Sequence, residues 1–180
     1  SLAIIARDGI LMNRKTSSTT KISMLNQLIK ESESAGGDST AILALLDKVI
    51  TSDKPDADIA SLKAAYMELK KMPEDSVNNA FRYVLSIAPE NTYATKKLIE
   101  SYWNRQRWDD IVSLCSQSVL YNPEDMTLYY FMGLAYFQKD DDDNALDALK
   151  RGVSEINDES DPAIVSDFYA IMGDILYKKG

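Results

Sequence analysis

The sequence predicts an all-α fold, an α-solenoid of about ten helices stacked as helix–turn–helix hairpins. Apolar residues recur at helical spacing through most of the 180 residues. Prolines and aromatic residues recur at a constant interval, which indicates a repeated structural unit. Short polar or glycine-containing segments separate the apolar stretches, as turns between helices do. Such units bury a continuous core only by stacking on their neighbours.

One such hairpin is clearest in the segment 124–152. Residues 128–137 are nearly all apolar or aromatic, with Gly133 in the middle, and a second apolar face follows four aspartates at 140–143. A glycine inside a helix costs about 0.5–1 kcal/mol relative to alanine, so it usually has a packing reason. We expect Gly133 to let the first helix approach the second near Ala145. The aspartates can cap the free amides of the second helix and suit its dipole.

Equally spaced markers divide the chain into units. Pro55, Pro89 and Pro123 are 34 residues apart, as are Tyr102 and Tyr136. Proline ends a helix or lies in the first turn of the next, so equal spacing marks equal units. The predicted units form a single array over residues 1–180. They are 24–57, 58–91, 92–125 and 126–159, with an insertion near 157–162 and half repeats at 1–13 and 166–180.

The residues at fixed places in each unit resemble the tetratricopeptide repeat (TPR) family, in the manner of a bacterial-type TPR scaffold protein. With Met126 as repeat position 1, family-typical residues stand at positions 4, 8, 20 and 27: Tyr129, Gly133, Ala145 and Gly152. Two residues depart from the pattern, since Asn157 replaces a usual proline and Glu68 replaces an aromatic. The resemblance implies a right-handed solenoid whose usual role is to hold a partner in its concave groove.

The N-terminal part is less regular. Residues 1–10 align with 144–153, with Gly9 over Gly152, so they resemble the second helix of a hairpin. We expect a polar loop at 13–20, a helix at 22–29 and a turn at 31–39 around two glycines.

The other end repeats the pattern of a first helix, with Tyr169, Met172 and Leu176 at core positions. These side chains would face water without a second helix. We therefore expect the polypeptide to extend beyond Gly180, or this end to pack on another chain.

Composition argues against several classes of function. The net charge is −8 and basic residues occur only in pairs, which disfavours nucleic acid as a partner. One cysteine allows no internal disulfide, and the absence of histidine removes the commonest general base and metal ligand. No apolar run approaches the roughly 20 residues of a membrane span. We expect a soluble protein whose compartment stays open, the bacterial cytoplasm being favoured and the periplasm the alternative.

No pattern indicates an enzyme, a cofactor or a metal site. Residues 140–151 superficially resemble a calcium loop, but Ala145 and Arg151 replace the glycine and glutamate that such a loop requires. Cys115 stands at a core position without a histidine to activate it, so we interpret it as a small buried side chain.

The TPR resemblance implies that positions 2, 5, 9 and 12 of each first helix line the concave surface. The predicted partner-binding residues are therefore Tyr66, Tyr93, Lys96, Trp103, Tyr130, Leu134, Phe137 and Tyr177. Large aromatic side chains on such a surface are typical of binding patches. The alternative is that Trp103, Phe137 and Tyr177 pad the contact between successive first helices.

Two functions are consistent with these features. The first is a non-catalytic module that binds a partner protein or peptide in the groove. The second is a structural or self-assembling segment of a longer multidomain protein, with self-association through the unpaired terminal helices. The resemblance disfavours the subclass that clamps acidic chaperone tails, because Tyr130 and Leu134 occupy two places where that subclass needs polar residues.

Overall fold

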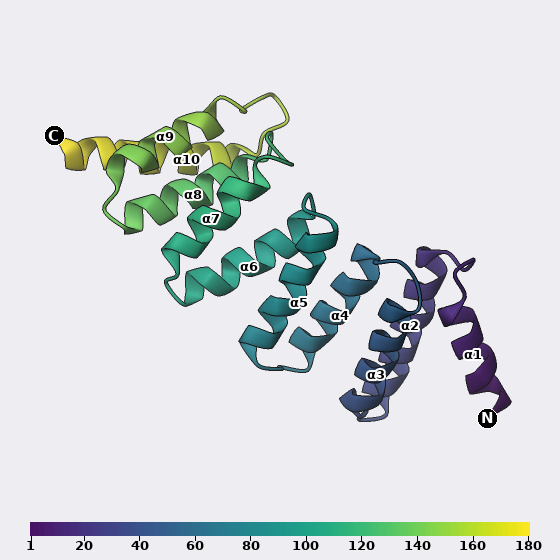
Figure 1. Ribbon diagram of the computed structural model, residues 1–180. Coiled ribbons are helices and arrows are strands. Elements are labelled where there is room, and N and C mark those ends of the chain that lie inside the picture. The colour runs from purple at the N-terminus through teal and green to yellow at the C-terminus, as the bar shows by residue number, and fades with distance from the viewer. The chain divides into compact units, whose positions relative to one another are not determined.

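The computed structural model describes residues 1–180 and is all-helical, as the sequence predicts (Figure 1). The ten helices are α1 (Leu2–Met12), α2 (Ser18–Ser34), α3 (Ser39–Thr51), α4 (Ala57–Leu69), α5 (Glu74–Ile87), α6 (Thr92–Asn104), α7 (Trp108–Ser118), α8 (Met126–Gln138), α9 (Asp142–Val153) and α10 (Pro162–Lys179). They form two compact units, residues 1–88 and 89–180, which we call unit 1 and unit 2. The boundary falls beside Pro89, one of the evenly spaced prolines.

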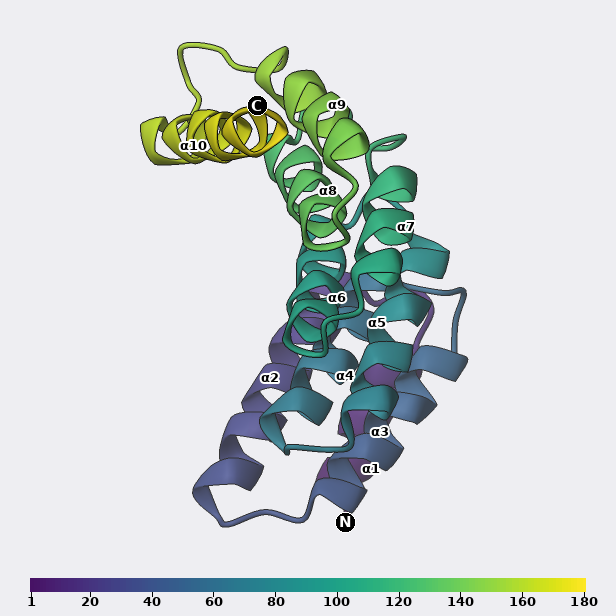
Figure 2. The same cartoon turned by 90° about the vertical axis from the view of Figure 1, so that its left-hand side faces the viewer.

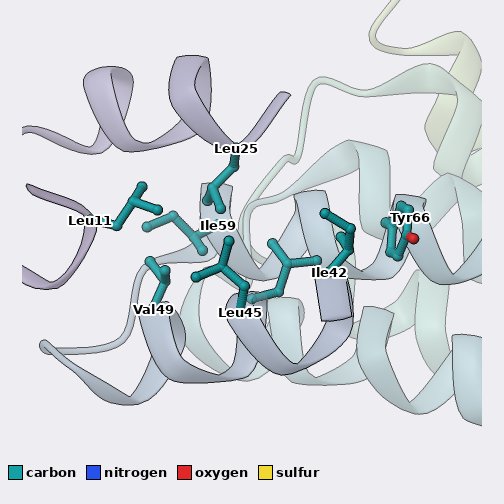
Figure 3. Packing of buried hydrophobic residues seen from close by; sticks show 8 residues of the cluster. Leu11, Leu25, Ile42, Leu45, Val49, Ile59 and Tyr66 are labelled. Carbon is teal, nitrogen blue, oxygen red and sulfur yellow. The ribbon is translucent and has the colours of Figure 1, made fainter. Parts of the chain in front are cut away.

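Unit 1 is built on an apolar core shared by four helices. Leu11 of α1, Leu25 of α2, Leu46 of α3 and Ile59 of α4 are all buried in this core. Figure 3 shows side chains from these separate helices converging, with Tyr66 at one end of the cluster. The stacking of helices around one core is what the repeat pattern requires, because no single hairpin covers its own apolar face.

The second helix is longer than the sequence pattern indicates. The two glycines predict a turn from residue 31, but α2 continues to Ser34 and contains 17 residues. The amide of Ala35 still donates to the Glu31 carbonyl, at 3.1 Å, so the helical hydrogen bonds extend to the end of this polar segment. The chain then turns at Gly36, whose φ of +72° is readily accessible to glycine.

Three hairpins close in the same way. Lys71, Gln106 and Asp140 each follow the C-cap residue of a first helix and have φ between 52° and 59°. The next amide donates back to a carbonyl five residues earlier, as in Arg107 to Tyr102 at 2.8 Å and Asp141 to Tyr136 at 3.0 Å. This pattern is the Schellman motif, which satisfies the free carbonyls at a helix end. The backbone therefore repeats even where the side chains do not.

The α8–α9 hairpin depends on glycine for its close packing. A Cβ atom on Gly133 would lie 2.6 Å from the Leu149 side chain and 3.4 Å from the Ala145 carbonyl oxygen. A Cβ atom on Gly152 would meet the Phe168 ring of α10 first, with Cζ of that ring 2.6 Å away, and would lie 2.9 Å from Cβ of Tyr129. The expected close approach at Gly133 is confirmed, with Leu149 as its nearest neighbour. Figures 1 and 2 both show α8 and α9 side by side in unit 2.

The four aspartates divide between capping and ion pairing. Asp141 is the N-cap of α9, and its carboxylate accepts a hydrogen bond from the Asn144 amide at 3.3 Å. Asp140 accepts from the Lys178 ammonium at 2.8 Å, and Asp143 pairs with Lys179. These two pairs join the end of α10 to the turn and first residues of α9.

The last helix buries one face and exposes another. Phe168 and Ile175 are fully buried against the rest of unit 2, whereas Tyr169 and Leu176 are 55% and 54% exposed. Met172 is half-buried, and a Cβ atom on Gly173 would have no neighbour within 4 Å. The expectation that the first-helix core positions of this segment face water is met at Tyr169 and Leu176.

Candidate interaction surface

Trp103 lies at the centre of an aromatic network in unit 2. Its indole ring contacts Trp108 edge to face, with centroids 4.9 Å apart, and Phe131 with centroids 6.4 Å apart. Trp108 begins α7 and Phe131 lies on α8, so Trp103 bridges its own hairpin and the next one. These edge-on geometries are favourable for aromatic pairs. The side chain stays half-buried, so part of its ring remains at the surface.

Tyr130 continues the network toward the last helix. Its ring centroid lies 5.8 Å from that of Phe131 and 5.4 Å from that of Phe168, which belongs to α10. Burial raises the pKa of the Tyr130 hydroxyl, and the nearby Asp167 carboxylate raises that pKa further. The phenol therefore stays neutral and available as a hydrogen-bond donor near neutral pH.

Further along α8, Leu134 and Phe137 are both half-buried. The Lys178 ammonium lies 5.4 Å from the Phe137 ring centroid, within the range of a cation–π contact. The same ammonium donates to Asp140, so it is held near the ring. Tyr177 of α10 is 90% exposed and is the most open aromatic side chain among the predicted binding residues.

The first turns of α6 carry the remaining predicted residues. Tyr93 is 45% exposed, and the Lys97 ammonium lies 5.9 Å from its ring centroid. Lys96 is exposed one turn further along the helix. We call the predicted residues that lie in unit 2 the unit 2 stripe; they are Tyr93, Lys96, Trp103, Tyr130, Leu134, Phe137 and Tyr177.

Tyr66 does not lie on an open surface. Its side chain is 2% exposed and belongs to the core cluster of unit 1, where Leu25 of α2 is also buried. Burial raises the pKa of its hydroxyl, an effect that the Lys70 ammonium opposes. The prediction that Tyr66 lines a binding surface is therefore corrected: α2 packs close to α4 and Tyr66 is enclosed in the core.

Phe131 was missed by the sequence reasoning, although it joins Trp103 to Tyr130. It stands at repeat position 6, outside the four positions that the family resemblance selects. The run of three aromatic residues at 129–131 was the available signal. Three successive aromatic residues on a helix cannot all share one face, so at least one of them must lie on a different face from the others.

The one cysteine of the chain is held in an unreactive state. The Cys115 side chain is fully buried, and burial raises the pKa of its thiol to about 12, so almost no thiolate is present near neutral pH. No three His, Cys, Asp or Glu side chains converge in a way that could hold a metal ion. No helix has the length and apolar character needed to cross a membrane.

Unit 1 contains a small surface pocket that the sequence did not predict. It has a volume of about 380 Å³ and lies between α4 and α5, with Met67, Ala80 and Tyr83 among its lining residues. Lys63 and Asn79 contribute polar groups to the wall. Its size and lining suit one apolar side chain with a polar neighbour.

Comparison with known proteins gives a fold and no family. No family model and no curated protein matches the sequence. Among solved structures, the chain is similar to MamA (residues 41 to the end) from Desulfovibrio magneticus RS-1, with a TM-score of 0.59 and 16% identity over 87% of this chain and 84% of that one. MamA from AMB-1 gives a TM-score of 0.55 and 20% identity over 87% and 86% of the two chains. MamA from MSR-1 gives 0.54 and 17% over 86% and 84%. This likeness supports a TPR-type helical-repeat fold.

Proposed function

We propose that this chain is a non-catalytic protein–protein interaction module that binds a partner protein or peptide on the unit 2 stripe. In a TPR array this face of the first helices is the concave groove. One observation carries the proposal: Trp103, Tyr130, Leu134 and Phe137 occupy the expected binding positions on successive first helices and stay only half-buried. Large aromatic side chains that a fold leaves partly uncovered are the usual anchors of an interface.

The charges around the unit 2 stripe support a particular chemistry for the partner. Glu100, Asp167 and Asp174 stand at the same repeat positions and are exposed. Lys96 is the only basic residue of the stripe itself, Lys97 and Lys178 lie against two of its rings, and the whole chain carries a net charge of −8. We propose a peptide segment with two or more apolar side chains and basic flanking residues. Apolar anchors would fill the aromatic surface, while opposite charge at the rim would raise the association rate.

The experiment compares Trp103→Ala with the matched variant Tyr121→Ala, which removes an aromatic side chain exposed elsewhere in unit 2. Partners captured from an extract of the source cells would be purified and titrated back onto each variant. A fully buried tryptophan costs about 3–5 kcal/mol on truncation, so half-buried Trp103 should cost about 1–2 kcal/mol of stability. Binding should fall at least ~10-fold for Trp103→Ala and stay unchanged for Tyr121→Ala.

Fluorescence gives an independent signal, because Trp103 and Trp108 are the only tryptophans in the chain and both lie at the proposed site. A partner on the unit 2 stripe should shift the emission of the wild-type protein. A loss of about 3–5 kcal/mol of unfolding free energy in Trp103→Ala, with unchanged partner binding, would refute the proposal. Trp103 would then be a residue that packs between successive first helices.

A second role, as a structural or self-assembling segment, is favoured by a different observation. The first and last helices each expose an apolar face that equivalent helices inside the array cover.

A further inference from the structure

A second pocket of unit 1 lies where the loop between α1 and α2 meets the loop between α3 and α4. Its volume is about 240 Å³, and the first turn of α2 forms part of its wall. The charged residues that line it are four basic and two acidic ones: Arg14, Lys15, Lys21, Lys54, Asp53 and Asp56. The pocket therefore has a formal charge of +2, although the whole chain carries −8. A local excess of positive charge in an acidic chain favours an anionic ligand.

The Lys21 ammonium has hydrogen-bond donors that the protein does not use. Lys21 is 3% exposed, because it shares the inward face of α2 with Leu25, one turn further along. The only carboxylate oxygen within 4 Å of its ammonium is Oδ2 of Asp53, at 3.9 Å, which is beyond hydrogen-bonding distance. A buried charge is costly unless it is paired and hydrogen-bonded. Lys21 also lies near the positive end of the α2 dipole, which an anion would compensate.

The start of α2 adds another unused donor. Ser17 caps the helix by accepting from the Thr20 amide at 3.2 Å, but the Ser18 amide at the pocket wall donates to no group of the protein. The first turn contains no acidic residue. Free amides and the helix dipole together suit an anion, and here a buried ammonium lies at the same site.

The two carboxylates of the pocket already accept hydrogen bonds. Asp56 is the N-cap of α4, where its Oδ1 accepts from two amides of that helix at 2.9 and 3.1 Å. Its Oδ2 accepts from the Ser18 hydroxyl. Asp53 accepts from the Lys54 amide at 2.7 Å. The negative charge of Asp56 is therefore used in holding the start of α4, and Asp53 is shared with a backbone amide.

The basic side chains at the rim are free to reach a ligand. Lys15 and Lys54 are exposed and have no ion-pair partner. The Arg14 side chain is 79% exposed, and its Nε lies 4.0 Å from Oδ1 of Asp53, too far for a hydrogen bond.

We propose that this pocket binds a phosphate group, either as free phosphate or on a phosphorylated side chain. Lys21 and the Ser18 amide donate from the wall, while Arg14 and Lys54 close over the group from the rim. A phosphate dianion matches the +2 charge of the pocket, and its oxygens can accept from all of these donors. The volume is below the roughly 300–1,000 Å³ of pockets that enclose drug-sized ligands, so the ligand is small. The site shares no residue with the unit 2 stripe, and the two proposals stand or fall separately.

Isothermal titration calorimetry of the whole chain tests the site with inorganic phosphate, O-phosphoserine and acetate at the same ionic strength. Lys21→Met removes the ammonium and keeps an apolar side chain at the buried position. Lys30→Met is the matched control, because Lys30 is exposed near the other end of α2. Phosphate affinity should fall about 10-fold or more in Lys21→Met, where a hydrogen bond to a charged group is lost, and stay unchanged in Lys30→Met. Acetate should bind far more weakly than phosphate.

The double variant Arg14→Gln/Lys54→Gln changes only exposed side chains, so it should fold normally and test the rim independently of Lys21. It should weaken phosphate binding by about 2–5-fold, as expected for exposed charge pairs. Tighter binding of O-phosphoserine than of inorganic phosphate would identify a phosphorylated side chain as the ligand; otherwise the ligand is the free anion. The proposal would be overturned by wild-type protein that binds phosphate no better than acetate. Unchanged affinity in both pocket variants, or an equal loss in Lys30→Met, would overturn it too.

Discussion

Repeat position 9 is occupied by Tyr66 in unit 1 and by Leu134 in unit 2, and the two side chains have different surroundings. Tyr66 is 2% exposed and belongs to the core, whereas Leu134 is half-buried at the surface. Both stand at the same place on a first helix. The repeat spacing therefore decides which face of the helix a residue occupies, and the neighbouring helix decides whether that face is covered.

The preceding first helix explains the difference. In unit 1 this helix is α2, with 17 residues, whereas α6 in unit 2 has 13. The Lys70 ammonium at the end of α4 pairs with Glu33 near the end of α2, at 2.8 Å. The longer α2 therefore stays close to α4 as far as its last turn and helps to enclose Tyr66.

A large effect on stability is expected where the same glycine position is covered in one helix and open in another. Gly133→Leu must force a side chain into Leu149, and overpacking of this kind costs about 1–3 kcal/mol. The leucine side chain of Gly173→Leu would enter open space. This variant should keep its stability or gain up to about 1 kcal/mol, because leucine has a better helix propensity than glycine. Thermal unfolding of dilute protein measures both. Similar melting temperatures would contradict the distinction between a covered glycine in α8 and an open one in α10.

A smaller effect is expected at the Tyr66 hydroxyl. This group is buried with no hydrogen-bond partner in the protein. An unsatisfied buried polar group is costly, so Tyr66→Phe should keep stability or raise it by about 1 kcal/mol. Tyr130→Phe is the matched variant in unit 2, where the side chain is only half-buried, and should change stability less. Urea unfolding of both variants gives the comparison, and a clear loss of stability in Tyr66→Phe would show that its hydroxyl is satisfied.

The smallest effect is expected from the ion pairs that join α10 to the α8–α9 turn. Hydrogen bonds from Lys178 and Lys179 lower the pKa values of Asp140 and Asp143, and the same bonds raise the pKa values of the two lysines. The carboxylates contribute stability above their unfolded pKa of 3.8 and lose it as the pH falls through the lower folded values. The lysines contribute below 10.5 and lose it as the pH rises through the higher folded values.

The double variant Lys178→Ala/Lys179→Ala should therefore melt slightly below wild type near neutral pH. Because these groups are exposed, the difference should shrink in about 1 M salt, where the Debye length is about 3 Å. It should also shrink in acid. A difference that is insensitive to salt and pH would instead indicate lost packing, for example of Lys178 on Phe137.

Much of the fold could be predicted because the apolar spacing, the helix-capping residues and the repeat interval all indicate the same helices. The close packing at Gly133 follows from a glycine in an otherwise apolar helix, and the capping of α9 follows from the aspartates before it. The exposure of Tyr169 and Leu176 follows from first-helix residues that have no second helix after them among the 180 residues.

The length of α2 and the burial of Tyr66 could not be predicted. Residues 31–34 are polar and lie beside two glycines, so they look like a turn, but a tertiary ion pair between Glu33 and Lys70 supports them as helix. Side-chain contacts between different hairpins could not be predicted either. Phe131 contacts the Trp103 ring, and Phe168 contacts the Tyr130 ring, each on another helix. The sequence of one repeat alone does not show those partners.

The claim that repeat position 9 is enclosed in unit 1 and open in unit 2 is tested most directly by comparing Tyr66→Ala with Leu134→Ala. Both change repeat position 9, and the tryptophans report on unit 2 while circular dichroism reports on both units. A buried Tyr66 should cost about 3–5 kcal/mol on truncation without weakening partner binding to unit 2, whereas half-buried Leu134 should cost about 1–2 kcal/mol and weaken that binding. Equal losses of unfolding free energy in the two variants would contradict the distinction between an enclosed position in unit 1 and an open one in unit 2.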